Sequence, residues 1–216
     1  MLNSYDKSVL NIYEQYPLLP REQTVQIAND MGVLHPEYRR VTKKDEGQAT
    51  VPLPNKVMST DFLIEKEKDG QIVQVAIWVK TSTDVDPSKS KNKGNLHKAE
   101  IEVTYWLENE IKCYGILKES INRNLIYNLK WFYEHAILDE ELNNKLKEWK
   151  KTFLDQANSE DSKTLSDIIK KTAFIINITY EDSVKLFRHC MWNQIINADI
   201  NEKIKLTDTV KINQFL

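Results

Sequence analysis

An acid, Asp61, and a lysine, Lys80, lie at the two ends of a segment that predicts a β-hairpin. Between them, apolar runs flank Asp69-Gly70, which is a strong signal for a tight hairpin turn. If these residues form the turn, Asp61 lies opposite Trp78, and a one-residue bulge would break this register. Because side chains alternate between faces of a strand, Asp61, Trp78 and Lys80 then share one face. Diagonal cross-strand neighbours lie roughly 7–8 Å apart, so this pair flanks a space that fits a small ion or a phosphate.

An acid on one strand and a lysine on the next are the residue types that metal-dependent phosphodiester hydrolysis requires. The reaction needs charge neutralised on the phosphate and a deprotonated water, and Mg²⁺ supplies both. Asp61 is then the candidate metal ligand, and Lys80 would orient the water or stabilise the developing charge. From the residues alone, an Asp that caps a turn and a solvated strand-end Lys are the more ordinary interpretations.

Further candidates follow the hairpin. Residues 81–95 read as a polar loop, and residues 96–110 carry apolar positions at helical spacing. Glu100 and Glu102 lie two residues apart on this helix, so they diverge by about 200° and only one can face the site. Exposed acids and a solvated loop are the alternatives. The lysines that could contact DNA phosphates are Lys89, Lys91 and Lys93.

Composition excludes several function classes. The chain has 216 residues, 41% apolar content and a formal net charge of −2, so any DNA contact must use local patches. The sequence lacks both glycine-rich nucleotide-binding motifs, which argues against nucleotide hydrolysis and dinucleotide binding. It contains no apolar run long enough for a membrane span and no signal-peptide core. With two cysteines at no metal-binding spacing, we expect a cytoplasmic protein with reduced thiols.

The coarse pattern predicts two domains. Residues 1–134 read as an α/β domain, with an extended lead-in over 1–20, a helix over 21–32, the hairpin, the helix at 96–110 and a strand at 111–118; residues 122–133 read as helix or extended segment. Residues 139–216 read as a small winged-helix domain. Its expected elements are helices at 139–157, 165–170 and 183–196, a strand-like run at 174–178 and a hairpin at 196–212.

Five segments, in this order and spacing, resemble the TnsA family, the endonuclease subunits of heteromeric cut-and-paste transposases. Residues 8–19 resemble V-x-D-I-R-E-Q-[FY]-P-L, and residues 26–36 match I-A-x-x-x-G-x-x-H-P. Residues 58–63, MSTDFL, match M-[ST]-T-D-F-L, and residues 77–80, IWVK, fall on x-V-K. Residues 96–106 fall on L-x-K-x-E-x-E-x-x-Y-W. The resemblance is strong over residues 8–133 and weak beyond them.

The resemblance implies a restriction-endonuclease-like core followed by a winged-helix domain. It implies Mg²⁺-dependent cleavage of DNA at the 5′ ends of a transposon, together with a DDE transposase subunit and an AAA+ regulator ATPase. Asp61, Lys80 and Glu102 would be the catalytic residues, and Asp61 and the Val79 carbonyl would hold the metal. We expect the domain after residue 139 to contact the regulator first and DNA second, because residues 181–200 contain few cations.

Two departures from the family pattern bear on activity. The family's first catalytic Glu lies upstream of the segment that begins at Ser8, and none of the residues before Ser8 matches that helix. A truncated chain, a late start codon and a lost ligand all fit this observation, and we expect the chain as written not to cut DNA by itself. The position before Val79 is a polar ligand in familiar members but is Trp78 here, and an indole cannot bind a hard cation.

Three functions are therefore weighed. The first is a Mg²⁺-dependent endonuclease subunit of a transposase. The second is a catalytically impaired nuclease-fold subunit that acts in transpososome assembly and DNA binding. The third is an unrelated winged-helix regulator whose α/β domain binds something else.

Overall fold

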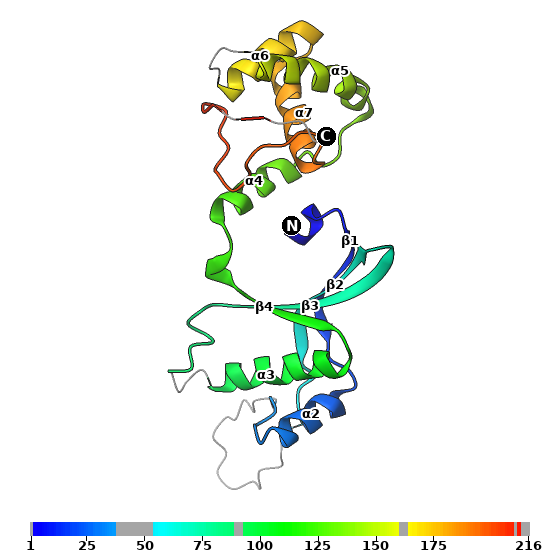
Figure 1. Ribbon diagram of the computed structural model, residues 1–216, viewed down its shortest axis with the longest axis vertical. Coiled ribbons are helices and arrows are strands. Elements are labelled where there is room, and N and C mark those ends of the chain that lie inside the picture. The colour runs from blue at the N-terminus through cyan, green and yellow to red at the C-terminus, as the bar shows by residue number, and fades with distance from the viewer. Residues whose placement is uncertain (1, 38–53, 89–92, 160–163, 210, 213–216) are drawn as a thin grey trace, which may run out of the picture. The chain divides into compact units, whose positions relative to one another are not determined.

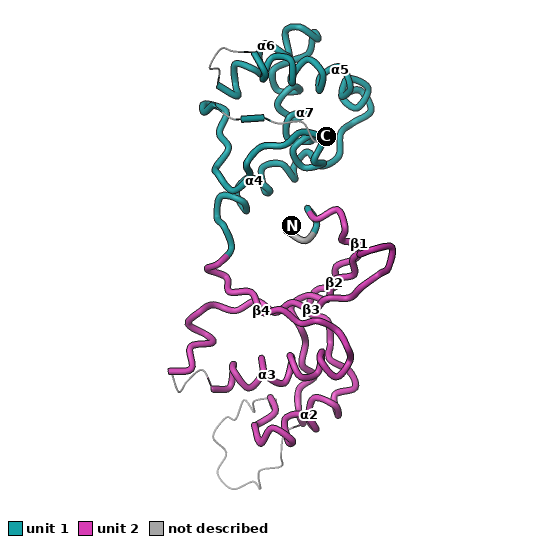
Figure 2. Tube along the Cα trace, viewed as in Figure 1, with its two compact units in different colours: residues 1–5, 121–216 teal, residues 6–120 magenta. Residues whose placement is uncertain are grey.

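The computed structural model describes residues 2–37, 54–88, 93–159, 164–209 and 211–212. No helix among these residues is long and apolar enough to cross a membrane. The chain divides into two compact units, one of residues 6–120 and one of residues 1–5 and 121–216 (Figure 2). This division falls before the sequence-predicted boundary at 134–139.

The first unit is a four-stranded sheet with helices packed beside it (Figure 1). The strand order is β1-β2-β3-β4. The β1–β2 and β2–β3 pairs are antiparallel, and β4 is parallel to β3. A helix, α3, makes the crossover between β3 and β4 that a parallel pair requires. The elements in chain order are β1 Val9–Pro17, α2 Arg21–Asp30, β2 Ser59–Lys68, β3 Gln71–Lys80, α3 Lys93–Glu108, β4 Lys112–Leu117 and the short η2 Lys118–Ser120.

The β2–β3 hairpin has the predicted turn and register. Asp69 and Gly70 have φ angles of 53° and 75°, as a type I′ turn requires at both central positions. Lys68 pairs with Gln71, and the ladder continues without a bulge to the Phe62–Ile77 pair. The prediction for this hairpin is therefore confirmed.

The core of this unit lies between the sheet and its two helices, α2 and α3, which Figure 1 shows on one side of the strands. The buried side chains are Leu18, Ile27, Ala28, Met58, Leu63, Ala76, Ile101, Tyr105 and Trp106. The predicted lead-in over residues 1–20 contains a strand, β1, that the sequence did not reveal. As an edge strand it is largely exposed, so it lacks the apolar alternation that marks a strand in sequence.

The second unit is helical. Its elements are α1 Leu2–Tyr5, α4 Arg123–Tyr133, α5 Glu140–Ala157, α6 Leu165–Ile176 and α7 Tyr180–Trp192. Trp149, Phe153 and Phe187 are fully buried at its centre, and the Trp149 indole N–H donates to Ser183 Oγ at 2.7 Å. Helix α4 packs on α7, which is why residues 121–134 belong with this unit. Helix α5 is capped by Asp139, whose side chain accepts a hydrogen bond from the Leu142 amide.

Two predictions for this unit are wrong. Residues 174–178 are not a strand, because α6 continues to Ile176 and ends at Asn177, which has a left-handed conformation. A short apolar run cannot by itself be assigned to strand or buried helix. The described residues of 196–212 contain no β-strand, so the expected terminal hairpin is absent there. A winged-helix arrangement is therefore not shown.

The segment after α7 is held by side chains rather than by strand pairing. Its apolar residues Ile196, Ala198 and Ile204 are buried in the helical core. Asn128 of α4, fully buried, donates to the carbonyls of residues 200 and 202 at 2.9 and 2.7 Å and accepts from the Ile204 amide at 3.0 Å. The apolar residues of the predicted hairpin instead anchor an irregular segment to the helical core.

Asn128→Ala should lower the free energy of unfolding of the protein by about 1–3 kcal/mol, because it leaves three main-chain groups, among them the buried Ile204 amide, without their partner. The measurement is urea denaturation followed by far-UV circular dichroism. Asn144→Ala, at an exposed position of α5, is the matched control and should change stability by less than about 0.5 kcal/mol. Equal effects of the two substitutions would contradict the anchoring role of Asn128.

Candidate active site

Asp61 and Lys80 meet at one end of the β2–β3 hairpin. The Val79 amide donates to Asp61 Oδ2 at 2.6 Å, and Lys80 Nζ lies 3.7 Å from the same oxygen. Both charged side chains are partly exposed, with 26% of Asp61 and 31% of Lys80 accessible, so a ligand can reach them. The hairpin thus places an acid and a lysine side by side in a solvent-accessible position.

Gln15 is a second contact of Asp61 that the sequence analysis did not single out. Its Nε2 donates to Asp61 Oδ1 at 3.2 Å, while its Oε1 accepts from the Ser59 hydroxyl at 3.2 Å. Gln15 has a φ of 50°, unusual for a non-glycine residue in a strand, on the strand that runs beside Asp61. The only signal in the sequence was its place in the Glu-Gln-Tyr-Pro segment of the family resemblance.

Of the two candidate acids on α3, the structure brings Glu102 to the site and leaves Glu100 exposed. Glu102 is 5% exposed, and its Oε1 has no hydrogen-bond partner among the described residues. Burial raises the pKa of Glu102 to about 7; the Thr60 hydroxyl and the Lys80 ammonium oppose this rise, and the Asp61 carboxylate adds to it. These interactions place Glu102 within electrostatic reach of both Asp61 and Lys80.

The effect of Glu102 on the Cys113 thiol indicates which strands Glu102 lies beside. Burial, with a contribution from the charge of Glu102, raises the pKa of Cys113 to about 12. Cys113 lies on β4 and pairs with Ala76 of β3. Glu102 therefore projects from α3 onto the face of the sheet that carries the helices, beside β3 and β4.

The site's oxygen donors are of the kind that hard divalent cations prefer. Asp61 and Glu102 supply carboxylates, and the unpartnered Oε1 of Glu102 is an acceptor without a donor. The Val79 carbonyl is a further candidate donor, because the amide and carbonyl of one strand residue point to the same edge of the strand and the Val79 amide points to Asp61. Within the described part of the chain, no cluster of three or more His, Cys, Asp or Glu residues is arranged to hold a metal. Mg²⁺ is commonly held by one or two carboxylates with waters and phosphate oxygens, so this donor set fits it.

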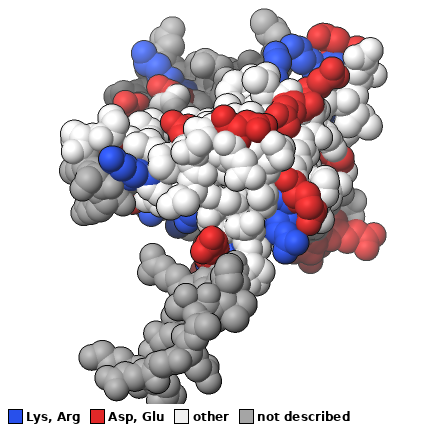
Figure 3. Space-filling view, turned by 90° about the horizontal axis from the view of Figure 1, so that it is seen from below, with Lys and Arg blue, Asp and Glu red and all other residues white. Residues whose placement is uncertain are grey.

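The predicted DNA-binding lysines are only partly described. Lys93 is exposed at the start of α3, whereas Lys89 and Lys91 lie outside the described residues. Figure 3, which views the molecule from below, shows Lys and Arg in separate groups and acidic side chains over a larger area of that face. The visible described surface there is not a continuous basic patch.

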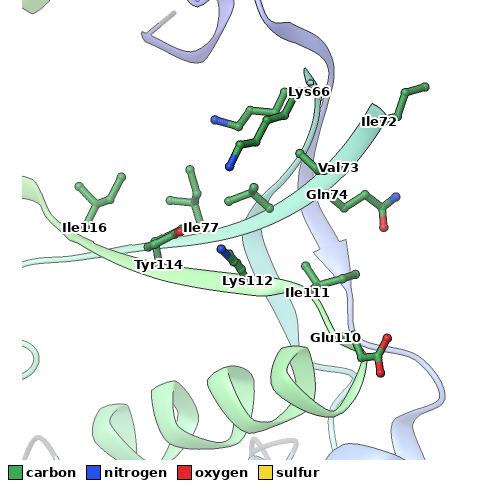
Figure 4. Close-up of a pocket in the computed structure, with 12 residues that line it drawn as sticks. Lys66, Ile72, Val73, Gln74, Ile77, Glu110, Ile111, Lys112, Tyr114 and Ile116 are labelled. Atoms are coloured by element: carbon green, nitrogen blue, oxygen red, sulfur yellow. The ribbon is translucent and has the colours of Figure 1, made fainter. Parts of the chain in front are cut away.

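A separate groove of about 860 Å³ lies over β3 and β4. Figure 4 shows most of its labelled side chains on the side of β3 opposite α3. Its floor is apolar, with Val75, Ile77 and Ile116, and Lys66 and Lys112 are among its polar lining residues. Since neither Asp61, Lys80 nor Glu102 lines it, this groove is distinct from the candidate active site.

Comparisons with known proteins match ranges of the chain that include all the candidate site residues. A family model described as "TnsA-like endonuclease N terminal" matches residues 6–119, and one described as "TnsA endonuclease C terminal" matches residues 120–200. The transposon Tn7 transposition protein TnsA of Escherichia coli is 35% identical over 142 residues. This alignment covers 66% of the chain and 44% of the Escherichia coli protein, so the matched region is less than half of that relative.

Glu102→Gln should change how stability depends on pH. A carboxyl whose pKa rises from 4.5 to about 7 on folding binds more protons in the folded state between these values, so wild-type stability falls as pH rises through this window. Relative to wild type, the Gln variant should therefore gain up to about 3 kcal/mol between pH 4.5 and pH 8.

The measurement is urea denaturation in EDTA at pH 5 and pH 8. Glu100→Gln, on the exposed side of the same helix, should leave the pH profile unchanged. Parallel pH profiles for wild type and Glu102→Gln would show that Glu102 is not a buried acid in solution.

Proposed function

The chain belongs to the TnsA-like endonuclease family, and we propose that it is the transposase subunit that hydrolyses phosphodiester bonds at the 5′ ends of a transposon. The observation that supports this proposal is the contact between Asp61 and Lys80, with the buried Glu102 within electrostatic reach of both. Family membership removes the alternative of an unrelated regulator.

We propose that Asp61, Glu102 and the Val79 carbonyl hold Mg²⁺ together with waters and phosphate oxygens of the DNA. The bound ion would stabilise negative charge on the phosphate and lower the pKa of a bound water. Asp61 Oδ2 accepts the Val79 amide and Oδ1 accepts Gln15, and each carboxylate oxygen has a second lone-pair direction for a cation. These two hydrogen bonds fix the carboxylate in one orientation before any ligand arrives.

Lys80 has the role of a fixed positive charge. Its ammonium lies beside Asp61 rather than in bulk solvent, and there it would orient the attacking water or stabilise charge that develops on the phosphate. Glu102 would supply the second carboxylate from the helix side of the sheet. The cost of burying this acid without a partner for Oε1 is consistent with a ligand site rather than with a structural role.

A second function, a catalytically impaired subunit for assembly and DNA binding, keeps specific support. The described residues supply only two carboxylates to this site. The position before Val79, where a further oxygen ligand could lie, is occupied by Trp78. The partners we propose for either function are transposon-end DNA, a DDE transposase subunit and an AAA+ regulator ATPase.

The activity test is end cleavage with the partner transposase and Mg²⁺, using this chain and, beside it, any longer version that its genomic reading frame encodes. Asp61→Ala should reduce 5′-end cleavage by about a thousandfold or more, because loss of a metal ligand costs several kcal/mol of transition-state stabilisation. Glu67→Ala, which removes an exposed acid near the far end of β2, is the matched control and should leave cleavage within about threefold.

The outcomes separate the two functions. Cleavage that depends on Asp61 in either version supports the endonuclease. End binding and complex assembly without cleavage in both versions would support the impaired subunit. Cleavage that survives Asp61→Ala would reject the site.

The helical unit gives a further prediction about partners. We expect the protein to bind the regulator ATPase through this unit, with an affinity that changes little between 50 and 200 mM salt. Duplex DNA binding should weaken steeply over the same range, because it rests on phosphate neutralisation. Isothermal titration of both ligands checks this. Salt-sensitive DNA binding without regulator binding would reverse the ranking.

A further inference from the structure

Trp78 and Gly115 form a close steric pair across β3 and β4. The two residues are register partners in the parallel ladder. A Cβ atom added to Gly115 would lie 2.1 Å from Trp78 Cζ2 and 2.4 Å from Cη2. The indole therefore rests directly on the glycine backbone, and any side chain at position 115 would displace it.

The indole is held there by shape rather than by a hydrogen bond. Trp78 Nε1 is buried and has no hydrogen-bond partner among the described residues. A buried N–H without a partner is destabilising, so the ring is placed there at some cost in stability. Its position then depends on the space that Gly115 leaves for it.

The end of β3 that carries Trp78 pairs with a neighbouring strand on one side only. The ladder between β2 and β3 ends at the Phe62–Ile77 pair. Beyond it, Trp78, Val79 and Lys80 pair only with β4. On the β2 side, this segment contacts the Asp61 carboxylate, which accepts a hydrogen bond from the Val79 amide and forms an ion pair with the Lys80 ammonium.

We propose that Trp78 is a positioning residue of the active site: its indole, seated on Gly115, fixes the end of β3 so that Val79 and Lys80 both reach Asp61. One consequence rests on the proposed function: the Asp61 site is already arranged to bind a divalent cation before the cation arrives. Trp78 itself supplies no ligand to the cation. Outer residues that orient metal ligands typically account for 10–100-fold in metal affinity.

The first readout needs no metal. A short hydrogen bond to a carboxylate shifts an amide proton downfield, so the Val79 resonance in a ¹H–¹⁵N spectrum reports the contact with Asp61. Asp61→Ala, which removes the acceptor, defines the position of this resonance when the contact is lost. Trp78→Ala and Gly115→Ala should each move this resonance toward its position in Asp61→Ala. Trp78→Phe, which keeps an aromatic ring on the glycine, should largely retain the wild-type position.

The second readout is Mn²⁺ affinity by isothermal titration on the full chain. Trp78→Ala should weaken Mn²⁺ binding by about tenfold. Gly115→Ala should not weaken it further in the Trp78→Ala background, because the indole with which a Cβ at position 115 would clash is then absent. If Gly115→Ala alone does not fold, the Trp78 variants and the double variant still decide. Gly94→Ala is the matched control, since a Cβ there meets no atom within 4 Å.

The results separate this inference from the proposed function. An unchanged Val79 resonance and unchanged Mn²⁺ affinity in Trp78→Ala would overturn the positioning role. Mn²⁺ affinity that survives Asp61→Ala would instead overturn the cation site, while the Val79 resonance would still report whether Trp78 positions the strand.

Discussion

The interaction on which the site depends is the hydrogen bond from the Val79 amide to the Asp61 carboxylate at 2.6 Å. It forms where the main-chain ladder between β2 and β3 has ended. A side chain thus replaces the strand partner that the amide lacks, and an unpaired amide is avoided. The same bond orients the carboxylate and brings the following residue, Lys80, to its side, so fold and candidate chemistry share one contact.

Around this contact the structure retains features that stability alone would disfavour. Glu102 is buried with one oxygen unpartnered, and the Trp78 indole N–H is likewise buried without a partner. Each is costly in an apolar environment. Their presence at the Asp61 end of the sheet, on the helix side, is consistent with the proposed ligand site between α3 and the strands.

Sequence reasoning succeeded where local rules decide the outcome. Asp69-Gly70 fixes the turn type, and side-chain alternation then brings Asp61 and Lys80 together. It left Glu100 and Glu102 undecided, because helix period separates two acids without saying which one faces the sheet. It missed Gln15, whose backbone conformation and contact with Asp61 depend on the tertiary pairing of β1 with β2.

In the helical unit, local pattern was a weaker guide. The apolar run at 174–178 suits a strand as well as a buried helix, and in the structure α6 continues through its first three residues. Residues 196–212 carry alternating apolar positions, yet their main chain is bound by Asn128 of a distant helix. Such long-range anchoring has no local sequence signature.

The most direct test of the central claim, that Asp61 and Glu102 are ligands of one divalent cation, is an anomalous diffraction map from crystals of the protein grown with Mn²⁺. The account predicts one anomalous peak at direct ligand distance from a carboxylate oxygen of each residue, with the Val79 carbonyl on the same side. Crystals of Asp61→Ala should lack this peak. A peak that lies away from both carboxylates, or none at saturating Mn²⁺, would contradict the account.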